Sequence, residues 1–374
     1  MGAEVIKIER PKMGDETRGF GPPFLKSTSG TPTKSLYFVS ANRGKRSVTI
    51  DTTKPEGQAL VRELAAKSDV FVENFKVGGM AKFGLDYTAL SKINPRLIYC
   101  SITGFGQTGP HRLRPGYDIV IQAMGGLMSI TGEPDGEPIK SGVAIADILT
   151  GLYATSAILA ALYERERSNA GQHIDLALLD VQIATLANQA ASFLHTGVTP
   201  QRHGNAHPNI CPYQAFQTSD GRIIVAVAND AQFQRFASIL GMPGWTDDPK
   251  FQTNASRVKN RDSLIPLIST RLLQKSSAEW LGELDRAEIP AGPVNNLDEV
   301  FQDPQIAARN LVVEFPPENG ERVRAAASPI RFSRNAISYE LPPPELGEHT
   351  EEVLSRILRK SSSSIRALRE TGVI

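Results

Sequence analysis

The stretch Leu97-Ile-Tyr-Cys-Ser-Ile-Thr-Gly-Phe-Gly106 decides the fold class, because a short apolar run passes directly into a glycine-rich loop. Such a run is typical of a buried strand in a parallel sheet. Similar runs alternate with helical stretches before it. We predict strands at Glu4 to Glu9, Ser47 to Asp51, Val70 to Glu73 and Leu97 to Ile102, with helices at Glu56 to Lys67 and Tyr87 to Ile93. The alternation predicts an α/β fold with mostly parallel strands.

Composition limits the class of protein. The chain has 374 residues, of which 40% are hydrophobic and 22% charged, enough for a sizeable core and about two domains. The net charge of +1 gives no general reason to expect nucleic acid or a membrane as partner. The apolar stretch from Val143 to Tyr163 is interrupted by Asp147, so we expect no membrane span. Cys100 and Cys211 match no disulfide or zinc pattern and are expected to be buried thiols.

The remaining chain predicts a second, smaller unit. A helix is expected from Asp147 to about Arg167, and the polar segment His195 to Pro212 is expected to separate two domains. Further expected elements are a hairpin at Tyr213 to Val227, helices at Ala231 to Leu240, Arg261 to Gln274 and Ala278 to Glu288, strands within Val312 to Phe332, and a helix at Glu351 to Leu368. The predicted fold class is α/β, with a Rossmann-like large domain (1–200, joined again by 311–374) and a small α+β domain (210–310).

Two motifs favour plain structural roles. Gly104 to Gly109 spells Gly-x-Gly-x-x-Gly, but Pro110 follows and no helix begins there, as a dinucleotide site requires. His203 and His207 are four residues apart, yet Gly204 and Pro208 forbid a regular helix that would aim both at a metal ion. Tight loops are the expected role of both segments.

Charge in the first 50 residues leaves two readings open. Nine basic residues against four acidic ones give +5, which fits a solvated face or a face that binds phosphate. The role of Asp147 also has two interpretations. The residue stands among apolar residues, where a carboxylate is unfavourable unless it has a specific role. It is either a helix cap or a carboxylate nucleophile activated by desolvation.

Several segments together resemble the class III CoA-transferases, the family that includes formyl-CoA transferase and the α-methylacyl-CoA racemases. The matching segments are Gly2-Ala-Glu-Val-Ile-Lys-Ile-Glu-Arg-Pro11, Gly14-Asp-Glu-Thr-Arg18, Asn42-Arg-Gly-Lys-Arg-Ser47, Asp69-Val-Phe-Val-Glu-Asn-Phe75, Asn94-Pro-Arg-Leu-Ile98, Ser101-Ile-Thr-Gly-Phe-Gly106, Gly116-Tyr-Asp118, Ala146-Asp147, Pro212-Tyr-Gln-Ala-Phe216 and Gly292-Pro-Val294. Within the family the chain looks most like the succinate-hydroxymethylglutarate (glutarate) CoA-transferase type.

The resemblance implies a site and a reaction. It makes Asp147 the nucleophile and implies an interlocked homodimer as the assembly. It places coenzyme A, as the acyl-CoA substrate, along Arg10, Ile50, Asp51, Thr52, Thr53, Asn74, Phe75, Lys76, Lys82, Pro115, Gly116, Tyr117 and Asp118. CoA would pass from a donor, expected to be succinyl-CoA, to a dicarboxylic acid such as glutarate or hydroxymethylglutarate. An aspartyl-CoA intermediate carries it, without metal or ATP.

Three details of the site are expected more loosely. Backbone N–H groups near Asp147, or those of Gly125 and Gly126, are expected to stabilise the oxyanion. Arg43, Arg114 and Arg202 are candidates for binding the distal carboxylate of the acid, because each adjoins a loop rich in Gly or Pro. The small domain is a candidate lid that keeps water from the anhydride.

Two departures from the family keep alternatives open. Family members begin earlier, so we expect that a first strand and helix are missing from this sequence, and a truncated, non-catalytic CoA-binding homologue is one alternative. The other is an α-methylacyl-CoA racemase-like enzyme, disfavoured because Tyr117 stands where the racemases carry a histidine. By the resemblance, the expected location is the mitochondrial matrix in a eukaryote and the cytoplasm otherwise.

Overall fold

Strand β6 (Ile98–Thr103) is the middle strand of a parallel sheet in the computed structural model, which describes residues 2–27, 29–316 and 322–374. Its neighbours are β5 (Val70–Glu73) and β7 (His173–Ala177), and the register pairs Val72 with Cys100 and Ser101 with Asp175. The strand is buried over most of its length, as the apolar run predicts. The predicted strand, its direction and the α/β fold class are therefore confirmed.

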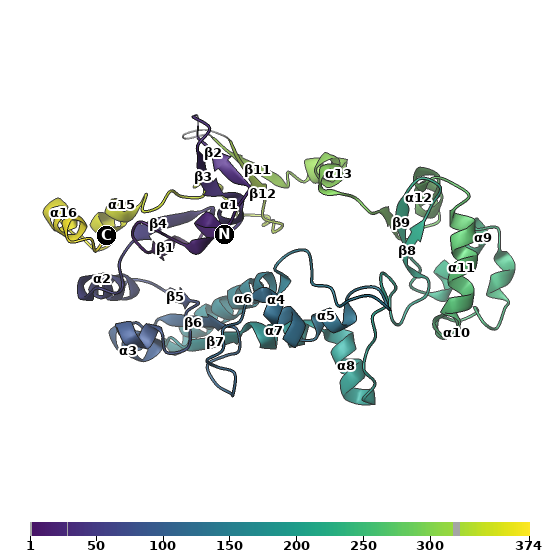
Figure 1. Ribbon diagram of the computed structural model, residues 1–374, viewed down its shortest axis with the longest axis horizontal. Coiled ribbons are helices and arrows are strands. Elements are labelled where there is room, and N and C mark those ends of the chain that lie inside the picture. The colour runs from purple at the N-terminus through teal and green to yellow at the C-terminus, as the bar shows by residue number, and fades with distance from the viewer. Residues whose placement is uncertain (1, 28, 317–321) are drawn as a thin grey trace. The chain divides into compact units, whose positions relative to one another are not determined.

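A second parallel pair joins β1 (Val5–Glu9) to β4 (Lys45–Thr49), with Ile8 opposite Val48. Helices α2 (Pro55–Ala65) and α3 (Tyr87–Ile93) lie close to their predicted ranges. One apolar core joins these elements to residues near the end of the chain; its members include Val48, Leu60, Leu64, Leu97, Tyr99, Val353 and Leu354. The end of the chain is thus part of the same core as the first strands (Figure 1).

The chain divides into two compact units. Unit 1 consists of Met1–Tyr117, Ala146–Val181 and Phe301–Ile374, and unit 2 of Asp118–Ile145 and Gln182–Val300. The other elements named for unit 1 are η1 (Glu16–Gly19), β2 (Phe24–Lys26), β3 (Pro32–Ser35), α1 (Leu36–Asn42), η2 (Met80–Phe83), α14 (Pro304–Ala308), β11 (Val312–Phe315), β12 (Val323–Ala326), α15 (Thr350–Arg356) and α16 (Ser362–Glu370). The elements at the unit boundaries are α6 (Ile145–Ser168), α7 (Leu178–Thr185) and α13 (Leu297–Gln302). The predicted domain boundaries stay predictions.

Unit 2 is built around a small antiparallel sheet in the order β10 (Ala291–Pro293), β9 (Arg222–Ala226) and β8 (Tyr213–Gln217). Its helices are α4 (Asp118–Met124), α5 (Leu127–Ile130), α8 (Ala187–Thr196), α9 (Asp230–Ile239), η3 (Pro243–Thr246), α10 (Asn254–Lys259), α11 (Arg261–Leu272) and α12 (Ser277–Arg286). Phe216, Val225, Phe233 and Trp280 belong to its core. The predicted hairpin and the three helices after it are confirmed.

Some predicted elements differ from the structure. The single helix predicted at Glu351 to Leu368 is wrong: it is α15 and α16, because Arg359 adopts a left-handed backbone with φ of 58° and Ser361 caps a new helix. The helical region 178–196 is likewise split into α7 and α8, beside Ala187 with φ of 47°.

Two further segments form short hairpins. Residues 19–33, for which no element is predicted above, contain β2 and the start of β3. In the region predicted as strands at Val312 to Phe332, β11 and β12 pair with each other, and residues 317–321 lie outside the described part of the chain. The strands predicted within Val312 to Phe332 are therefore confirmed, whereas the Gly and Pro residues between 19 and 33 concealed a short hairpin.

Candidate active site

Asp147 lies in the first turn of α6. The helix begins at Ile145, two residues before the predicted start, so Asp147 is inside the first turn rather than at the cap position. The first turn of a helix carries a partial positive charge, which stabilises a carboxylate. The side chain is exposed in the single chain. The desolvation expected from its apolar neighbours is therefore not present in one copy of the protein.

The exposure follows from how α6 packs. Its buried residues are mostly small or polar, as Ala146, Thr150 and Ala154 illustrate. Its large apolar side chains point outward instead: Ile148 is 49% exposed and Leu152 60%. In the part of the chain that is described, α6 is also the one helix long and apolar enough to cross a membrane, by length and composition alone, with 22% of its most apolar window buried. Large apolar side chains on a helix of this length call for a covering surface.

One group of the predicted CoA residues follows the sheet of β1 and β4. Arg10 comes directly after β1, is exposed, and forms an ion pair with Glu16 at 3.3 Å. Ile50 is buried and donates its N–H to the carbonyl of Glu9 at 2.9 Å. Because the strands are parallel, Arg10 and the segment after β4 leave the sheet at the same edge. Ligands of α/β proteins bind beyond this carboxyl edge.

The segment after β4 forms a turn held by side chains. The carboxylate of Asp51 accepts the N–H of Thr53 at 3.0 Å and its hydroxyl at 2.6 Å. These two hydrogen bonds hold the pKa of Asp51 below its usual range. Thr52 lies between Asp51 and Thr53 in the chain, and its carbonyl accepts a hydrogen bond from the Nε2 of Gln58 in α2 at 3.1 Å. The backbone of this turn is therefore shaped before any ligand binds.

A buried carboxylate, that of Glu9, directly precedes Arg10 at the end of β1. Glu9 is almost fully buried and pairs with Arg18 at 2.8 Å, while Ser47 donates to it at 2.6 Å and the Asp15 amide at 3.0 Å. Burial raises the pKa of Glu9, but the hydrogen bonds from Arg18, Ser47 and the Asp15 amide outweigh it, so the pKa lies below its usual value. Glu9 is thus ionised and fixed at the end of β1.

A second group of predicted residues follows β5. Asn74 donates to the carbonyl of Ile102 at 2.6 Å, which ties the end of β5 to β6. Phe75 is half exposed, and its N–H bonds the Glu73 carboxylate at 2.7 Å. Lys76 closes a turn through its carbonyl, which accepts the N–H of Gly79 at 2.7 Å. These residues also stand at the carboxyl edge of their sheet.

The last predicted residues are Lys82 and the segment Pro115–Asp118. Lys82 is exposed in the short helix η2. Gly116 lies against Gly104, since a Cβ on Gly104 would be 2.8 Å from the Gly116 Cα. Tyr117 is 74% exposed, and Asp118 begins α4 with its carboxylate accepting a hydrogen bond from Gln122 at 2.6 Å.

The glycine-rich loop after β6 has the form expected of it. No helix begins between Gly104 and Tyr117, as Pro110 predicts. Asp175 of β7 accepts the N–H of Gln107 at 3.2 and 3.1 Å through its two carboxylate oxygens. Asp175 is not among the site residues predicted from the sequence. Its signal is a carboxylate within an apolar strand that neighbours a glycine-rich loop.

The three candidates for the distal carboxylate have different surroundings. Arg43 lies 5.8 Å from the centre of the Tyr339 ring and Arg114 lies 5.6 Å from that of Phe105. The Arg202 guanidinium donates to three carbonyls of the turn at Glu133–Gly136, the shortest at 2.7 Å to Gly136. Arg202 is therefore already engaged in holding a turn, whereas the other two guanidinium groups contact aromatic rings.

The candidate oxyanion donors also differ. The N–H of Gly125 donates to the carbonyl of Ile121 at 2.7 Å. The N–H of Gly126 lies 3.5 Å from the carbonyl oxygen of Ala123, which is at the outer limit of a hydrogen bond. Gly126 is thus the freer donor of the pair.

The two histidines lie in a loop, as predicted. His207 accepts the N–H of Asn209 on Nδ1 at 3.1 Å, and its ring centre is 5.3 Å from that of Tyr213. Burial lowers the pKa of His203, and the charge of Arg261 lowers it further. Among the described residues, no group of three His, Cys, Asp or Glu side chains is arranged to bind a metal ion.

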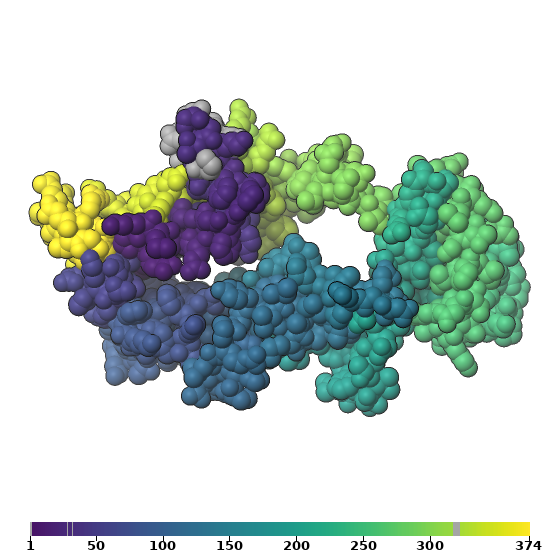
Figure 2. Space-filling view, in the orientation of Figure 1, coloured from purple at the N-terminus to yellow at the C-terminus, as the bar shows by residue number. Residues whose placement is uncertain are grey.

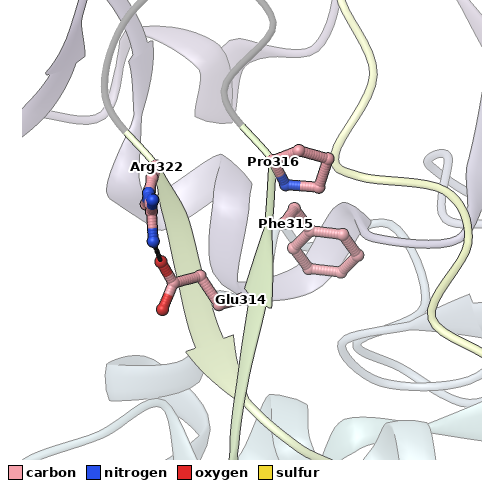
Figure 3. A pocket seen from close by; sticks show the side chains of 4 residues that line it. All are labelled: Glu314, Phe315, Pro316 and Arg322. Atoms are coloured by element: carbon pink, nitrogen blue, oxygen red, sulfur yellow. Dashed lines mark hydrogen bonds and ion pairs between the residues drawn. The ribbon is translucent and has the colours of Figure 1, made fainter.

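The thiols and the surface pocket lie outside this set of residues. Cys100 and Cys211 are both buried and free, as expected. Burial, with a smaller contribution from Glu73, raises the pKa of Cys100 to about 11. A pocket of about 300 Å³ is lined by Glu314, Phe315, Pro316 and Arg322, where Arg322 pairs with Glu314 at 2.8 Å (Figure 3). None of these pocket residues belongs to the predicted site.

Comparison with known proteins adds an independent finding. The sequence profile of CoA-transferase family III matches residues 1–350. The chain is 51% identical to the succinate–glutarate CoA-transferase of Agrobacterium fabrum, over 96% of this chain and 89% of that one. It is 43% identical to the succinyl-CoA:glutarate CoA-transferase of Mus musculus, over 100% and 84%. A crystal structure of a CAIB/BAIF family protein from Brucella suis superposes with a TM-score of 0.82 at 48% identity, covering 95% of this chain and 92% of the other.

Proposed function

Because the chain belongs to CoA-transferase family III, we propose that it moves CoA from succinyl-CoA to glutarate or a similar dicarboxylic acid through the carboxylate of Asp147. The chain is a CoA-transferase, and its relatives at 43 to 51% identity are named for transfer between succinyl-CoA and glutarate. The observation that carries the assignment to Asp147 is its carboxylate in the first turn of α6, where helix N–H groups favour negative charge.

The first half of the reaction loads CoA onto the enzyme. The Asp147 carboxylate attacks the thioester carbon of succinyl-CoA, so a C–O bond forms, the C–S bond breaks and CoA leaves as a thiolate. This step leaves a mixed anhydride of Asp147 and succinate. The thiolate then attacks the Asp147 carbonyl of the anhydride, which releases succinate and leaves an aspartyl-CoA thioester.

The second half repeats these steps with the acceptor. A carboxylate of glutarate attacks the aspartyl thioester and releases the CoA thiolate, which leaves a second mixed anhydride. The thiolate attacks the glutaryl carbonyl, so glutaryl-CoA forms and Asp147 regains its carboxylate. One thioester replaces another, and the chemistry therefore needs neither ATP nor a metal ion. Each attack develops an oxyanion, for which Gly126 N–H is a candidate donor.

CoA is expected to bind along the carboxyl edges of the two parallel sheets. The exposed cations Arg10 and Lys82 suit its phosphate groups. The turn at Ile50–Thr53 and the side chain of Asn74 suit the adenine and pantetheine parts, because their own backbone geometry is already held by internal hydrogen bonds. Arg43 and Arg114 remain candidates for the distal carboxylate of the acid.

The active form is expected to be a homodimer. The outward side of α6 carries large apolar residues beside Asp147, among them Ile148 and Leu152. A second copy that covers this side would remove the apolar surface from water at about 25 cal/mol per Å². It would also exclude water from Asp147 and so protect the anhydride from hydrolysis.

A substitution on α6 tests the dimer. Gly151 is exposed, and a Cβ built on it meets no atom within 4 Å apart from its chain neighbours and the backbone of its own helix, so Gly151→Trp leaves room for folding of one chain. Gly282→Trp is the matched control, because Gly282 is an exposed helical glycine of α12 with equally open surroundings. Sedimentation velocity is expected to show a dimer for the wild type and the control, and a monomer for Gly151→Trp. A wild-type monomer would contradict this part of the proposal.

The reaction itself is tested with succinyl-CoA and a panel of free acids led by glutarate and hydroxymethylglutarate. Mass spectrometry reads new acyl-CoA species, and Asp147→Asn is the control because it keeps the size of the side chain and removes the nucleophile. New thioesters that vanish in the control support the proposal. With succinyl-CoA alone, the peptide that contains Asp147 is expected to carry CoA as a thioester.

Two results would contradict the proposal. CoA binding without transfer would indicate a non-catalytic CoA-binding protein, and deuterium exchange at the α-carbon of a branched acyl-CoA would indicate a racemase. The location proposed is the mitochondrial matrix in a eukaryote and the cytoplasm in a bacterium. Cell fractionation with an antibody to this chain measures it, and recovery in another compartment would overturn it.

A further inference from the structure

Gln122 is a fully buried residue of α4 whose side-chain amide is used at both ends. Its Nε2 donates to the Oδ2 of Asp118 at 2.6 Å. Its Oε1 accepts the backbone N–H of Ser141 at 2.8 Å. One side chain therefore holds both the carboxylate of Asp118 and the main chain at Ser141, and all three residues belong to unit 2.

A buried side-chain amide, unlike an apolar side chain of the same size, needs hydrogen-bond partners. Methionine has a similar size and would need no hydrogen bonds in this position. An amide without partners is unfavourable in the interior, so Gln122 is stabilised there only while both partners stay in place. The bond to Asp118 is short, as expected when the acceptor is charged. The pair of hydrogen bonds thus specifies one relative position of Asp118 and Ser141.

Each of the two partners adjoins a part of the proposed site. Asp118 directly follows Tyr117 in the segment assigned to CoA. Ser141 begins the short segment that leads into α6, where the N–H of Ile145 bonds the carbonyl of Val143 at 2.8 Å, two residues before Asp147. A shift of Asp118 relative to Ser141 would therefore change both the chain next to Tyr117 and the chain that leads into α6.

We propose that Gln122 is a positioning residue of the transferase, which holds the CoA-contacting turn at Asp118 in register with the segment that leads to Asp147. The proposal rests on the proposed function, because that function supplies the roles of Asp118 and Asp147. Gln122 itself touches neither substrate nor CoA. It acts through Asp118 and through the main chain at Ser141.

Exchanging the amide and the carboxylate tests this role. Gln122→Glu removes the donor and sets two carboxyl groups against each other, and Gln122→Met removes both hydrogen bonds. Each variant is expected to weaken CoA binding and raise KM for succinyl-CoA about tenfold, the effect of one lost hydrogen bond to a charged group. The double variant Asp118→Asn with Gln122→Glu restores one amide and one carboxylate in exchanged positions. This double variant is expected to bind CoA more tightly than Gln122→Glu alone, because the hydrogen bond between positions 118 and 122 is restored with its direction reversed.

The control is Gln182→Met, because Gln182 is another fully buried glutamine of unit 2, and its Nε2 bonds Thr185 at 3.1 Å rather than Asp118. Gln182→Met is expected to leave the affinity for CoA unchanged and to change thermal stability little, because the Gln182 Oε1 that it removes is buried without a hydrogen-bond partner among the described residues. Calorimetry with CoA and thermal unfolding are measured for every variant. A purely structural role of Gln122 would lower the thermal stability of the Gln122 variants without changing their affinity for CoA.

Two results would overturn the proposal. One is single Gln122 variants that bind CoA as the wild type does. The other is a folded double variant whose affinity for CoA is as low as that of Gln122→Glu. The calorimetric readout needs no turnover, so the role of Gln122 is decided even if the wild type binds CoA but transfers none, a result that would count against the proposed function instead.

Discussion

The backbone N–H of Asp51 donates to the carbonyl oxygen of Val373 at 2.7 Å, although more than three hundred residues separate them in the chain. Val373 is buried, and the C-terminal residues (yellow) lie against the early segment that contains α2 (indigo; Figure 2). The ammonium of Lys54 adds hydrogen bonds to the carbonyls of Thr371 at 2.6 Å and Gly372 at 2.9 Å. The end of the chain therefore supports the turn at Ile50–Thr53.

We expect Lys54→Met to raise KM for succinyl-CoA about fivefold, because the turn loses a charge-assisted contact with the C-terminal residues and becomes more mobile. The control is Lys67→Met, since Lys67 also donates to a carbonyl near the end of the chain, that of Ile357 at 2.6 Å. Steady-state kinetics with succinyl-CoA make the comparison. Equal KM values for the two variants would show that the Lys54 contact does not support the turn.

Gly57→Ala is expected to disturb the same turn from the side of α2. A Cβ on Gly57 would lie 2.0 Å from the carbonyl oxygen of Asp51, so α2 or the turn must move. We expect a loss of about 2 kcal/mol in the free energy of unfolding, together with a higher KM for succinyl-CoA. Gly282→Ala meets no atom within 4 Å and is expected to stabilise α12 slightly. Urea unfolding of both variants tests the contrast, and an unchanged Gly57→Ala protein would refute it.

Arg257 is expected to be essential for the stability of unit 2. It is fully buried, donates to the carbonyls of Cys211 at 2.8 Å and Phe251 at 2.9 Å, and pairs with Asp230 at 2.8 Å. Arg257→Met removes the donor of these hydrogen bonds and should lower the free energy of unfolding by about 3 to 5 kcal/mol. Arg235→Met, on the exposed side of α9, should cost less than about 1 kcal/mol.

The two tryptophans allow the stability of unit 2 to be measured separately. The chain has two tryptophans, Trp245 and Trp280, and both lie in unit 2. Tryptophan fluorescence during urea unfolding therefore reports unit 2. Coincident curves for Arg257→Met and the wild type would show that the buried guanidinium contributes no net stability.

Stability is expected to fall in acid through Asp15. Burial raises the pKa of Asp15, but hydrogen bonds from Lys7 and Thr17 outweigh it and lower the pKa to about 2. A depressed pKa means that the stabilisation is complete above the unfolded value of 3.8 and is lost as the pH falls towards 2. Asp15→Asn should therefore lower the free energy of unfolding by about 2 kcal/mol at pH 7. Between pH 4 and 2 its free energy of unfolding should change less with pH than that of the wild type.

The control for this pH dependence is Asp285→Asn, a substitution of an exposed residue of α12. Urea unfolding followed by circular dichroism at pH 7, 4 and 3 measures both variants. The interpretation is refuted if the free energy of unfolding of Asp15→Asn changes between pH 4 and 3 as much as that of the wild type.

The two thiols are expected to react only when their unit opens. Burial raises the pKa of Cys100 to about 11 and also raises the pKa of Cys211, so neither is a thiolate at pH 8. Alkylation at pH 8 in increasing urea, followed by peptide mapping, should label each cysteine at the transition of its own unit, since Cys100 lies in unit 1 and Cys211 in unit 2. Fast labelling of either thiol without urea would contradict the burial.

Much of the fold could be predicted because its signals are local. The apolar runs at β5 and β6 are short and end in polar loops, and α6 has acid in its first turn and base in its last. The position of the predicted CoA residues at strand ends follows from the same signals, since parallel strands end at one edge. The break at Arg359 was missed because the amphipathic pattern continues across it while one left-handed residue redirects the backbone.

Local sequence signals predict the strands, most helices and the candidacy of Asp147, because periodicity, caps and loop residues act over a few neighbours. Three features become visible only in the packed chain: the side of α6 that faces outward, the link from Asp118 through Gln122 to Ser141, and the contact of Val373 with Asp51. The contacts of Gln122 with Ser141 and of Val373 with Asp51 depend on how segments far apart in the chain pack within each unit. Many pairs of residues have the right chemistry for such contacts, and only the packed chain selects among them.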